Sequence, residues 1–344
     1  MEPLSILDPE GRLHAAAPLG DEQALEALRL MLLSRALDER AIKLQRLGRL
    51  GTYGPVHGQE ASVVGSAIAL DPSRDWLVPA YREQPAMIRH GLPLERLLAG
   101  YMGRSNAARI PDGVRLLPRN QAVGAQLPHA AGLAWGLKLR KLEGVVLVYC
   151  GEGASSEGDF HESANLAGVV GAPLVYLLQN NGYAISTPSA RQSAAPALAL
   201  RAAGYGFPGI LVDGNDLFAV HAATREAVER ARRGEGPTLI ESRTYRMGVH
   251  NTTDNPREYR DDAETLDHAG RDPIARVARY LEARGLWGEQ AAARVRQEIA
   301  AEIDEAQRRA AEFPRPSAAD VYEHAYGVPP PRVQQQRRET LEGR

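Results

Sequence analysis

The stretch from Val145 to Thr187 reads VVLVYCGEGASSEGDFHESANLAGVVGAPLVYLLQNNGYAIST, and it decides the fold. The apolar, β-branched run at 145–150 predicts a buried strand, and a second apolar run at 174–178 predicts another. Between them, residues 157–170 predict a helix that the following glycine and proline end. A strand, a helix and a strand in this order predict two adjacent parallel strands joined by a right-handed crossover.

Polar residues stand at the carboxyl ends of both predicted strands. Glu152 lies between two glycines after the first strand, and Asn181 follows the second. Parallel strands bring these ends to one edge of the sheet, where open α/β sheets bind ligands. Carboxylate and amide oxygens, with a backbone carbonyl and water, suit Mg²⁺. The backbone amides of Gly153 and Ala154, near the start of the next helix, suit an anion such as a diphosphate.

A glycine-rich turn after a strand is also typical of dinucleotide-binding folds. That fingerprint would need a third glycine or an alanine at the position of Ser156. An acid between the two glycines would repel a bare pyrophosphate unless a cation lay between them. No Gly-Lys-Ser/Thr follows, which excludes a P-loop. The motif favours a magnesium–diphosphate site, and a nicotinamide oxidoreductase of Rossmann type is kept as an alternative.

The pattern GEGASSEGDFHE…QNNGYAIST resembles the thiamine diphosphate motif, a Gly-Asp-Gly followed one helix and one strand later by Asn-Asn. Over residues 22–322 the chain is similar to the alpha subunit of the decarboxylating component of 2-oxo acid dehydrogenase complexes, the pyruvate and branched-chain family. Glu152 stands where many relatives have aspartate, and branched-chain members also use glutamate. The resemblance implies a mostly parallel α/β sheet with helices on both faces, which forms the diphosphate-binding half of a thiamine enzyme.

Length and resemblance together suggest how the chain is divided. The 344 residues are enough for about two domains, or for one α/β domain with helical extensions. We expect an N-terminal arm and helix at 1–50, a thiamine diphosphate-binding α/β domain at 51–270, and a C-terminal helical extension with a polar tail at 271–344. Within the first part, a helix is predicted at 21–47 with Asp21 as its N-cap.

The composition is that of an ordinary globular protein, with 44% hydrophobic and 24% charged residues and a net charge of −2. This charge balance suggests no nucleic acid and no anionic membrane as a partner. No run approaches the roughly 18 apolar residues of a membrane span, and the acidic N-terminus lacks the features of a signal peptide. We expect a cytoplasmic location, with the single cysteine, Cys150, buried in the core.

Candidate cofactor-binding residues follow a predicted strand at 76–79. The planar fork of an arginine such as Arg82 pairs well with phosphate oxygens, although the pattern alone favours a surface salt bridge with Glu83. The resemblance implies that Tyr81 and Arg82 hold the cofactor and its diphosphate. It also implies that Gln121 and Val123 contact the cofactor, with Val123 beneath the bend between its two rings.

A histidine lies in a polar loop beyond the predicted strand at 238–244. A lone loop histidine is usually incidental, but His250 matches the Tyr-Arg-x-x-x-His loop of the family and is implied to face the reacting end of the cofactor. Neutral imidazole can exchange protons near pH 7. The resemblance further implies that Glu152, Asn181 and the Tyr183 carbonyl hold Mg²⁺. His57 has no counterpart in the family, and we expect it on the surface.

The resemblance implies thiamine diphosphate- and Mg²⁺-dependent oxidative decarboxylation of a 2-oxo acid, with acyl transfer to a lipoyl-bearing acyltransferase component. It also implies a beta subunit that completes the active site, in a heterotetramer of two alpha and two beta chains. The substrate stays open. Residues 58–61 resemble pyruvate members, whereas 181–187 and 214–216 resemble branched-chain members, and an acetoin dehydrogenase is a further alternative. A non-catalytic assembly subunit is another.

Overall fold

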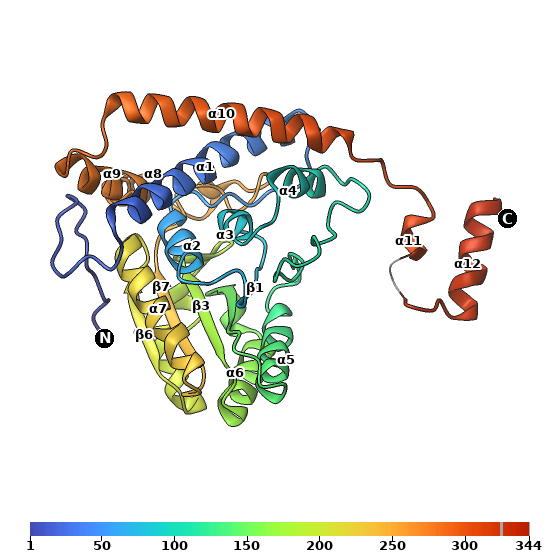
Figure 1. Cartoon of the computed structure of the whole chain (residues 1–344), viewed down its shortest axis with the longest axis horizontal. Helices are drawn as coiled ribbons and strands as arrows, with labels where there is room; N and C mark the ends of the chain where they lie inside the picture. The colour runs from blue at the N-terminus through green and yellow to red at the C-terminus, as the bar shows by residue number, and fades with distance from the viewer. Residues whose placement is uncertain (324–325, 344) are drawn as a thin grey trace.

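The computed structural model describes residues 1–323 and 326–343. Its centre is a parallel five-stranded sheet with the strand order β1-β2-β3-β7-β6, as Figure 1 shows. A two-stranded antiparallel hairpin, β4-β5, lies outside this sheet. The strands are β1 (Trp76–Val78), β2 (Val146–Gly151), β3 (Leu174–Asn180), β4 (Tyr183–Ala184), β5 (Thr187–Pro188), β6 (Gly209–Asp213) and β7 (Thr238–Arg243). The predicted fold class is therefore confirmed.

The predicted strand–helix–strand unit is present as β2, α6 (Gly158–Val170) and β3. Strands β2 and β3 are adjacent and parallel, with Gly151 opposite Gln179 at the carboxyl end of the pair. Helix α6 ends at Gly171, which has a φ of 57°, a left-handed conformation that glycine adopts without a steric penalty.

Both faces of the sheet are buried, and successive residues of a strand point to opposite sides. In β2, Leu147 and Tyr149 belong to one apolar core, whereas Val146, Val148 and Cys150 belong to the other. This explains the continuous apolar runs, which are typical of parallel strands covered by helices on both sides. The expectation that Cys150 is a buried core residue is confirmed.

Helices cover the two faces unequally, as Figure 1 shows. Helices α5 and α6 pack on one face, while the other carries most of the remaining helices, including α1 and α10. The helices other than α6 are α1 (Asp21–Arg46), α2 (Glu60–Ala67), α3 (Gln84–Arg89), α4 (Leu94–Tyr101), α5 (Gln126–Leu139), α7 (Leu217–Arg232), α8 (Asp262–Ala269), α9 (Pro273–Ala283), α10 (Glu289–Glu312), α11 (Asp320–Glu323) and α12 (Pro331–Glu342). No helix in the described residues is both long and apolar enough to cross a bilayer.

Two local predictions need correction. The N-cap of α1 is Gly20 rather than Asp21; Asp21 lies in the first helical turn and forms a salt bridge with Arg284 at 2.9 Å. The polar tail contains a helix, α12, because proline fits the first helical turn and the following glutamines, arginines and glutamates are good helix formers. The three-part division into domains stays a prediction.

The N-terminal arm is anchored to the far edge of the sheet. Leu4 forms a parallel bridge with Val212 of β6, so the arm covers the exposed edge of that strand. The carboxylate of Asp216 holds the next residues, since its Oδ2 accepts from the amides of Ile6 at 2.6 Å and Leu7 at 2.7 Å. Its Oδ1 caps α7. Asp216 therefore has a structural role in this turn.

Replacing Asp216 with alanine should leave several buried donors without an acceptor. We expect the free energy of unfolding to fall by about 3 kcal/mol in urea titrations. The matched control is Asp261→Ala, which removes an exposed N-cap of α8 and should cost less than about 1 kcal/mol. Equal losses in the two variants would contradict the anchoring role of Asp216.

Candidate functional site

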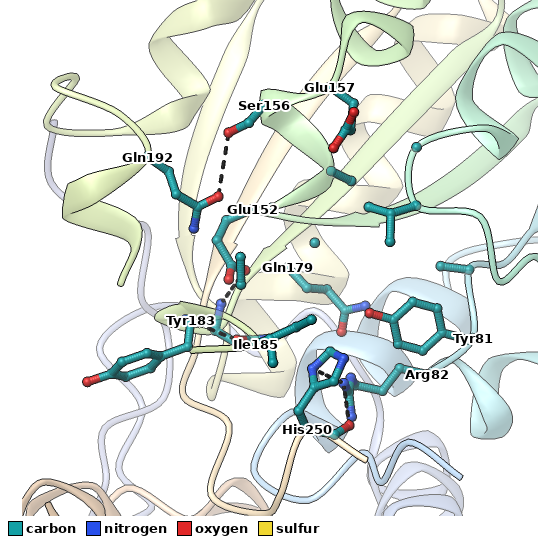
Figure 2. Close-up of a pocket in the computed structure, with 18 of the residues that line it drawn as sticks. Tyr81, Arg82, Glu152, Ser156, Glu157, Gln179, Tyr183, Ile185, Gln192 and His250 are labelled. Atoms are coloured by element: carbon teal, nitrogen blue, oxygen red, sulfur yellow. Dashed lines mark hydrogen bonds between the residues drawn. The ribbon is translucent and has the colours of Figure 1, made fainter. Parts of the chain in front are cut away.

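A cavity of about 550 Å³ lies at the carboxyl edge of the sheet. Figure 2 shows its walls, which come from the segments after β1, β2, β3 and β7. All but one of the predicted site residues line this cavity, the exception being Gln121. Those present are Tyr81, Arg82, Val123, Glu152, Gly153, Ala154, Asn181, Tyr183 and His250.

Glu152 and Asn181 meet at this edge, as the parallel pairing of β2 and β3 predicts. The backbone amide of Asn181 donates to Oε2 of Glu152 at 3.2 Å, and both residues are buried. Burial raises the pKa of the Glu152 carboxyl, an effect that nearby Arg246 and Arg82 oppose. A buried acid with few partners of its own is well suited to a cation, because the cation would offset the cost of losing water.

Two glutamines complete this corner of the cavity, and the sequence reasoning missed both as site residues. Gln59 accepts from the Asn181 side-chain amide at 3.2 Å, and Gln179 donates to Glu83 at 2.8 Å. In the described structure, Nε2 of Gln59 and Oε1 of Gln179 are buried without a hydrogen-bond partner. Such groups indicate that a ligand or water belongs here. The sequence signal that could have identified Gln179 as a site residue is its place as a polar residue at the end of an apolar strand.

The Tyr183 carbonyl is already engaged by a buried arginine. Arg246 donates from Nη1 to the Tyr183 oxygen at 3.2 Å and from Nη2 to the Ile185 oxygen at 2.7 Å. These bonds fix the β4-β5 hairpin, which closes one side of the cavity. A carbonyl oxygen has two lone pairs, so that of Tyr183 can still serve as a metal ligand.

Gly153 and Ala154 lie at a short 3₁₀ turn, Ala154–Ser156, that precedes α6. A side chain at 153 would meet the Cβ of Ala184 at 2.8 Å, so glycine lets the hairpin approach the loop. The two residues line the cavity, but they are separated from α6 by this turn. They lie near the start of α6, as predicted, and anion binding by their backbone amides stays a prediction.

Arg82 is buried and does not form the surface salt bridge weighed from the sequence. Its guanidinium donates to the Pro55 carbonyl at 2.6 Å and to the His250 carbonyl at 3.0 Å. The Glu83 carboxylate instead accepts from the backbone amides of Ala80 at 2.9 Å and Arg82 at 3.1 Å. The hydrogen-bond acceptors of the guanidinium are two carbonyls and the His250 ring rather than a carboxylate, an arrangement compatible with binding an anion.

His250 lies beside two arginines, as Figure 2 shows in part. Its Nδ1 is 3.3 Å from Nη2 of Arg82 and 3.3 Å from Nη1 of Arg246. Its backbone amide donates to Asp254 at 2.6 Å, which orders the loop. Burial and the two guanidinium groups lower the pKa of His250 to about 4, so the imidazole is neutral near pH 7.

Two expectations about neighbouring residues have different outcomes. Gln121 lines a smaller adjoining cavity of about 130 Å³, which shares Tyr81, Val123 and His250 with the main one. The expectation that His57 is a surface residue is wrong. It is half-buried, and burial, with Arg35 nearby, lowers its pKa to about 4.

The donor set fits a hard divalent cation better than a softer metal. Within residues 1–323 and 326–343, no three His, Cys, Asp or Glu side chains gather as a metal cluster. The oxygens of Glu152, Asn181 and Tyr183 form a mixed set of a carboxylate, an amide and a carbonyl. Mg²⁺ takes such oxygens and keeps further positions for water and for substrate phosphates.

These features are those of a polar cavity at the carboxyl edge of a parallel α/β sheet, the place where open α/β folds bind ligands. A family model described as "Dehydrogenase E1 component" matches residues 28–319. The chain therefore belongs to the dehydrogenase E1 component family. Membership confirms the resemblance to an alpha subunit of thiamine diphosphate-dependent 2-oxo acid dehydrogenases, and it excludes the Rossmann-type nicotinamide alternative.

Curated relatives agree over almost the whole chain. "Pyruvate dehydrogenase E1 component subunit alpha" of Staphylococcus epidermidis is 45% identical over 313 residues, which are 89% of this chain and 84% of that protein. The protein of the same name from Bacillus subtilis is 42% identical over 335 residues, which are 96% of this chain and 90% of that protein. The protein of the same name from Staphylococcus aureus is 41% identical over 339 residues, which are 97% of this chain and 91% of that protein.

The environment of His250 can be tested by NMR titration of its imidazole. We expect a midpoint near pH 4 for the unliganded chain and a higher midpoint in Arg82→Gln, which lacks one neighbouring positive charge. Between pH 6.5 and 4 the unfolded chain takes up this proton before the folded chain does, so the histidine lowers stability as the pH falls. An unchanged midpoint in Arg82→Gln would contradict the electrostatic explanation.

Proposed function

We propose that this chain is the alpha subunit of a pyruvate dehydrogenase E1 component that uses thiamine diphosphate and Mg²⁺. The observation that carries the proposal is the meeting of the Glu152 carboxylate and Asn181 in a cavity that also contains Arg82. Oxygen ligands beside a buried guanidinium that forms no salt bridge suit a metal and a diphosphate bound together. The cytoplasmic location expected from the sequence belongs to the same proposal.

Each group of residues has one task in this proposal. Glu152, the side chain of Asn181 and the Tyr183 carbonyl would hold Mg²⁺. Arg82 and Tyr81, with the backbone at Gly153 and Ala154, would hold the diphosphate. These residues belong to the proposed cofactor-binding domain, residues 51–270. Val123 and Gln121, across the two connected cavities, would contact the rings of the cofactor.

Thiamine diphosphate, when bound, supplies the nucleophilic carbon and the electron sink for decarboxylation of a 2-oxo acid. His250 would donate a proton from Nε2 at the reacting end, because the two arginine donors at Nδ1 make that nitrogen the acceptor and leave the hydrogen of the neutral imidazole on Nε2. Arg82 and Arg246 hold the ring in place through Nδ1. The anionic diphosphate would reduce the field of these arginines and raise the pKa of the imidazole.

Pyruvate is favoured as the substrate because the relatives that match most of this chain carry the name pyruvate dehydrogenase. The branched-chain-like residues at 181–187 form the β4-β5 hairpin at one wall of the cavity. They leave 2-oxoisovalerate and acetoin as the substrates to compare. The acyl group would pass to a lipoyl-bearing acyltransferase component.

A beta subunit would complete the site. Val123 and Ile185 line the cavity with side chains that are 51% and 54% exposed, unusually high values for apolar residues in a ligand site. Cover from the cofactor and from a second chain would remove this apolar surface from water. The relatives are named as one kind of subunit, "alpha", which supports the proposed heterotetramer of two alpha and two beta chains.

Cofactor binding can be tested by calorimetry with thiamine diphosphate in the presence and absence of Mg²⁺. We expect Glu152→Gln and Asn181→Ala to weaken Mg²⁺-dependent binding by at least about tenfold, since each removes a metal ligand. Glu143→Gln, an exposed acid outside the cavity, is the control and should bind normally. Unchanged binding in both site variants would refute the proposed metal site.

Subunit dependence and substrate can be tested by co-purification with a candidate beta subunit. We expect the chain alone to show at most about 1% of the decarboxylation rate of the complex, because the beta subunit is expected to complete the active site. Among pyruvate, 2-oxoisovalerate and acetoin, pyruvate should give the highest kcat/KM. Full activity of the isolated chain would overturn the heterotetramer proposal.

A further inference from the structure

A buried acid on α1 contacts the segment 53–58, which runs beneath the site. Asp38 is 2% exposed, and its Oδ1 accepts from the Tyr53 hydroxyl at 2.7 Å. Its Oδ2 accepts from the backbone amides of Val56 at 2.8 Å and His57 at 3.0 Å. Three donors from one short segment therefore converge on a single carboxylate.

The same segment, residues 53–58, also contacts the side chain of Arg82. The Pro55 carbonyl accepts from Nη1 of Arg82 at 2.6 Å, and the Gly54 carbonyl accepts from Gln84 at 3.0 Å. A Cβ at position 54 would lie 3.3 Å from Nη1 of Arg82, so the backbone and the guanidinium are in close contact. A shift of residues 54–56 would therefore move Arg82 directly.

The segment also supports the loop of His250, on both sides of that residue. The His57 carbonyl accepts from the amide of Met247 at 3.1 Å, and the Tyr53 carbonyl accepts from the amide of Thr252 at 3.0 Å. Arg82 in turn donates to the His250 carbonyl at 3.0 Å. Two site residues from distant parts of the chain are thus held by one segment.

We propose that Asp38 is a positioning residue that sets the placement of Arg82 and His250 through residues 53–58, an inference that rests on the proposed function. The acid itself lies outside the residues that line the cavity. Residues that fix a site through supporting hydrogen bonds determine how precisely its reacting groups are placed.

A carboxylate suits this task because it only accepts hydrogen bonds. Burial raises the pKa of Asp38 to about 7, so an acid at this place costs stability that an apolar residue would not. An asparagine has the same shape but must place its donor amide against either the two backbone amides or the tyrosine hydroxyl. The substitution Asp38→Asn therefore disturbs the contact with little change in volume.

The test compares Asp38→Asn and Tyr53→Phe with the control Glu39→Gln in the complex with the beta subunit. Tyr53→Phe removes one of the three donors and keeps both backbone contacts. Glu39 is the exposed neighbour of Asp38 on α1. Hydrogen exchange is followed in peptides covering 53–58 and 246–252, and the half-saturating concentration of thiamine diphosphate is measured at fixed Mg²⁺.

In Asp38→Asn we expect exchange of both segments to accelerate by about tenfold while α10 is unchanged. The half-saturating concentration of thiamine diphosphate should rise by about tenfold, and kcat at saturating cofactor should fall by about threefold because the loop of His250 is also released. In Tyr53→Phe, the exchange rates of both segments and the half-saturating concentration of thiamine diphosphate should each rise by about threefold. Glu39→Gln should match wild type in both measurements.

Unchanged exchange in both segments would overturn the proposal, and so would faster exchange with unchanged half-saturation. If Asp38→Asn does not fold, the proposal is decided by comparing Tyr53→Phe with Glu39→Gln. The measurements are again hydrogen exchange of the two segments and the half-saturating concentration of thiamine diphosphate. Wild-type protein that does not respond to thiamine diphosphate would refute the proposed function instead. The exchange data would then still decide whether Asp38 holds the two segments.

Discussion

The structure depends on the parallel pairing of β2 with β3, which brings two chain reversals to one edge of the sheet. The register that sets Gly151 opposite Gln179 leaves Glu152 and Asn181 side by side just beyond the hydrogen-bonded ladder. No other arrangement of these strands would give a carboxylate and an amide a common cavity, because an antiparallel pair would separate the two ends. The remaining site residues are arranged around this corner by loops from the neighbouring strands.

The charge of the site follows from how its arginines are held. The acceptors that the structure gives Arg82 and Arg246 are carbonyl, imidazole and phenol groups rather than carboxylates. Neutral acceptors satisfy the geometry of a guanidinium without cancelling its charge. Burial is the main cause of the lowered pKa of His250, and the two guanidinium groups add to it. The same two arginines would attract the anionic cofactor of the proposed function.

The sequence predicted those parts of the fold and site that local patterns determine. The strands, α6 and the pair Glu152 and Asn181 follow from apolar runs and from residues at their ends. Gln59 and Asp38 were missed because their roles depend on packing between distant segments; Gln59 meets Asn181 122 positions further along the chain. His57 was misplaced for the same reason, since Arg35, Asp38 and Gly248, which lie close to it in the fold, come from distant parts of the chain.

The β4-β5 hairpin forms one wall of the cavity and carries two energetic costs there. Ile185 has a φ of 56°, a strained conformation for a β-branched residue, and Arg246 holds its carbonyl at 2.7 Å. This conformation leaves the side chain at the cavity with 54% of its surface exposed, an apolar cost added to the backbone strain. The hydrogen bond from Arg246 offsets part of the backbone strain, and a cofactor ring and a second subunit over Ile185 would offset the apolar cost. The exposed side of the hairpin is thus the feature that the proposed beta subunit would explain.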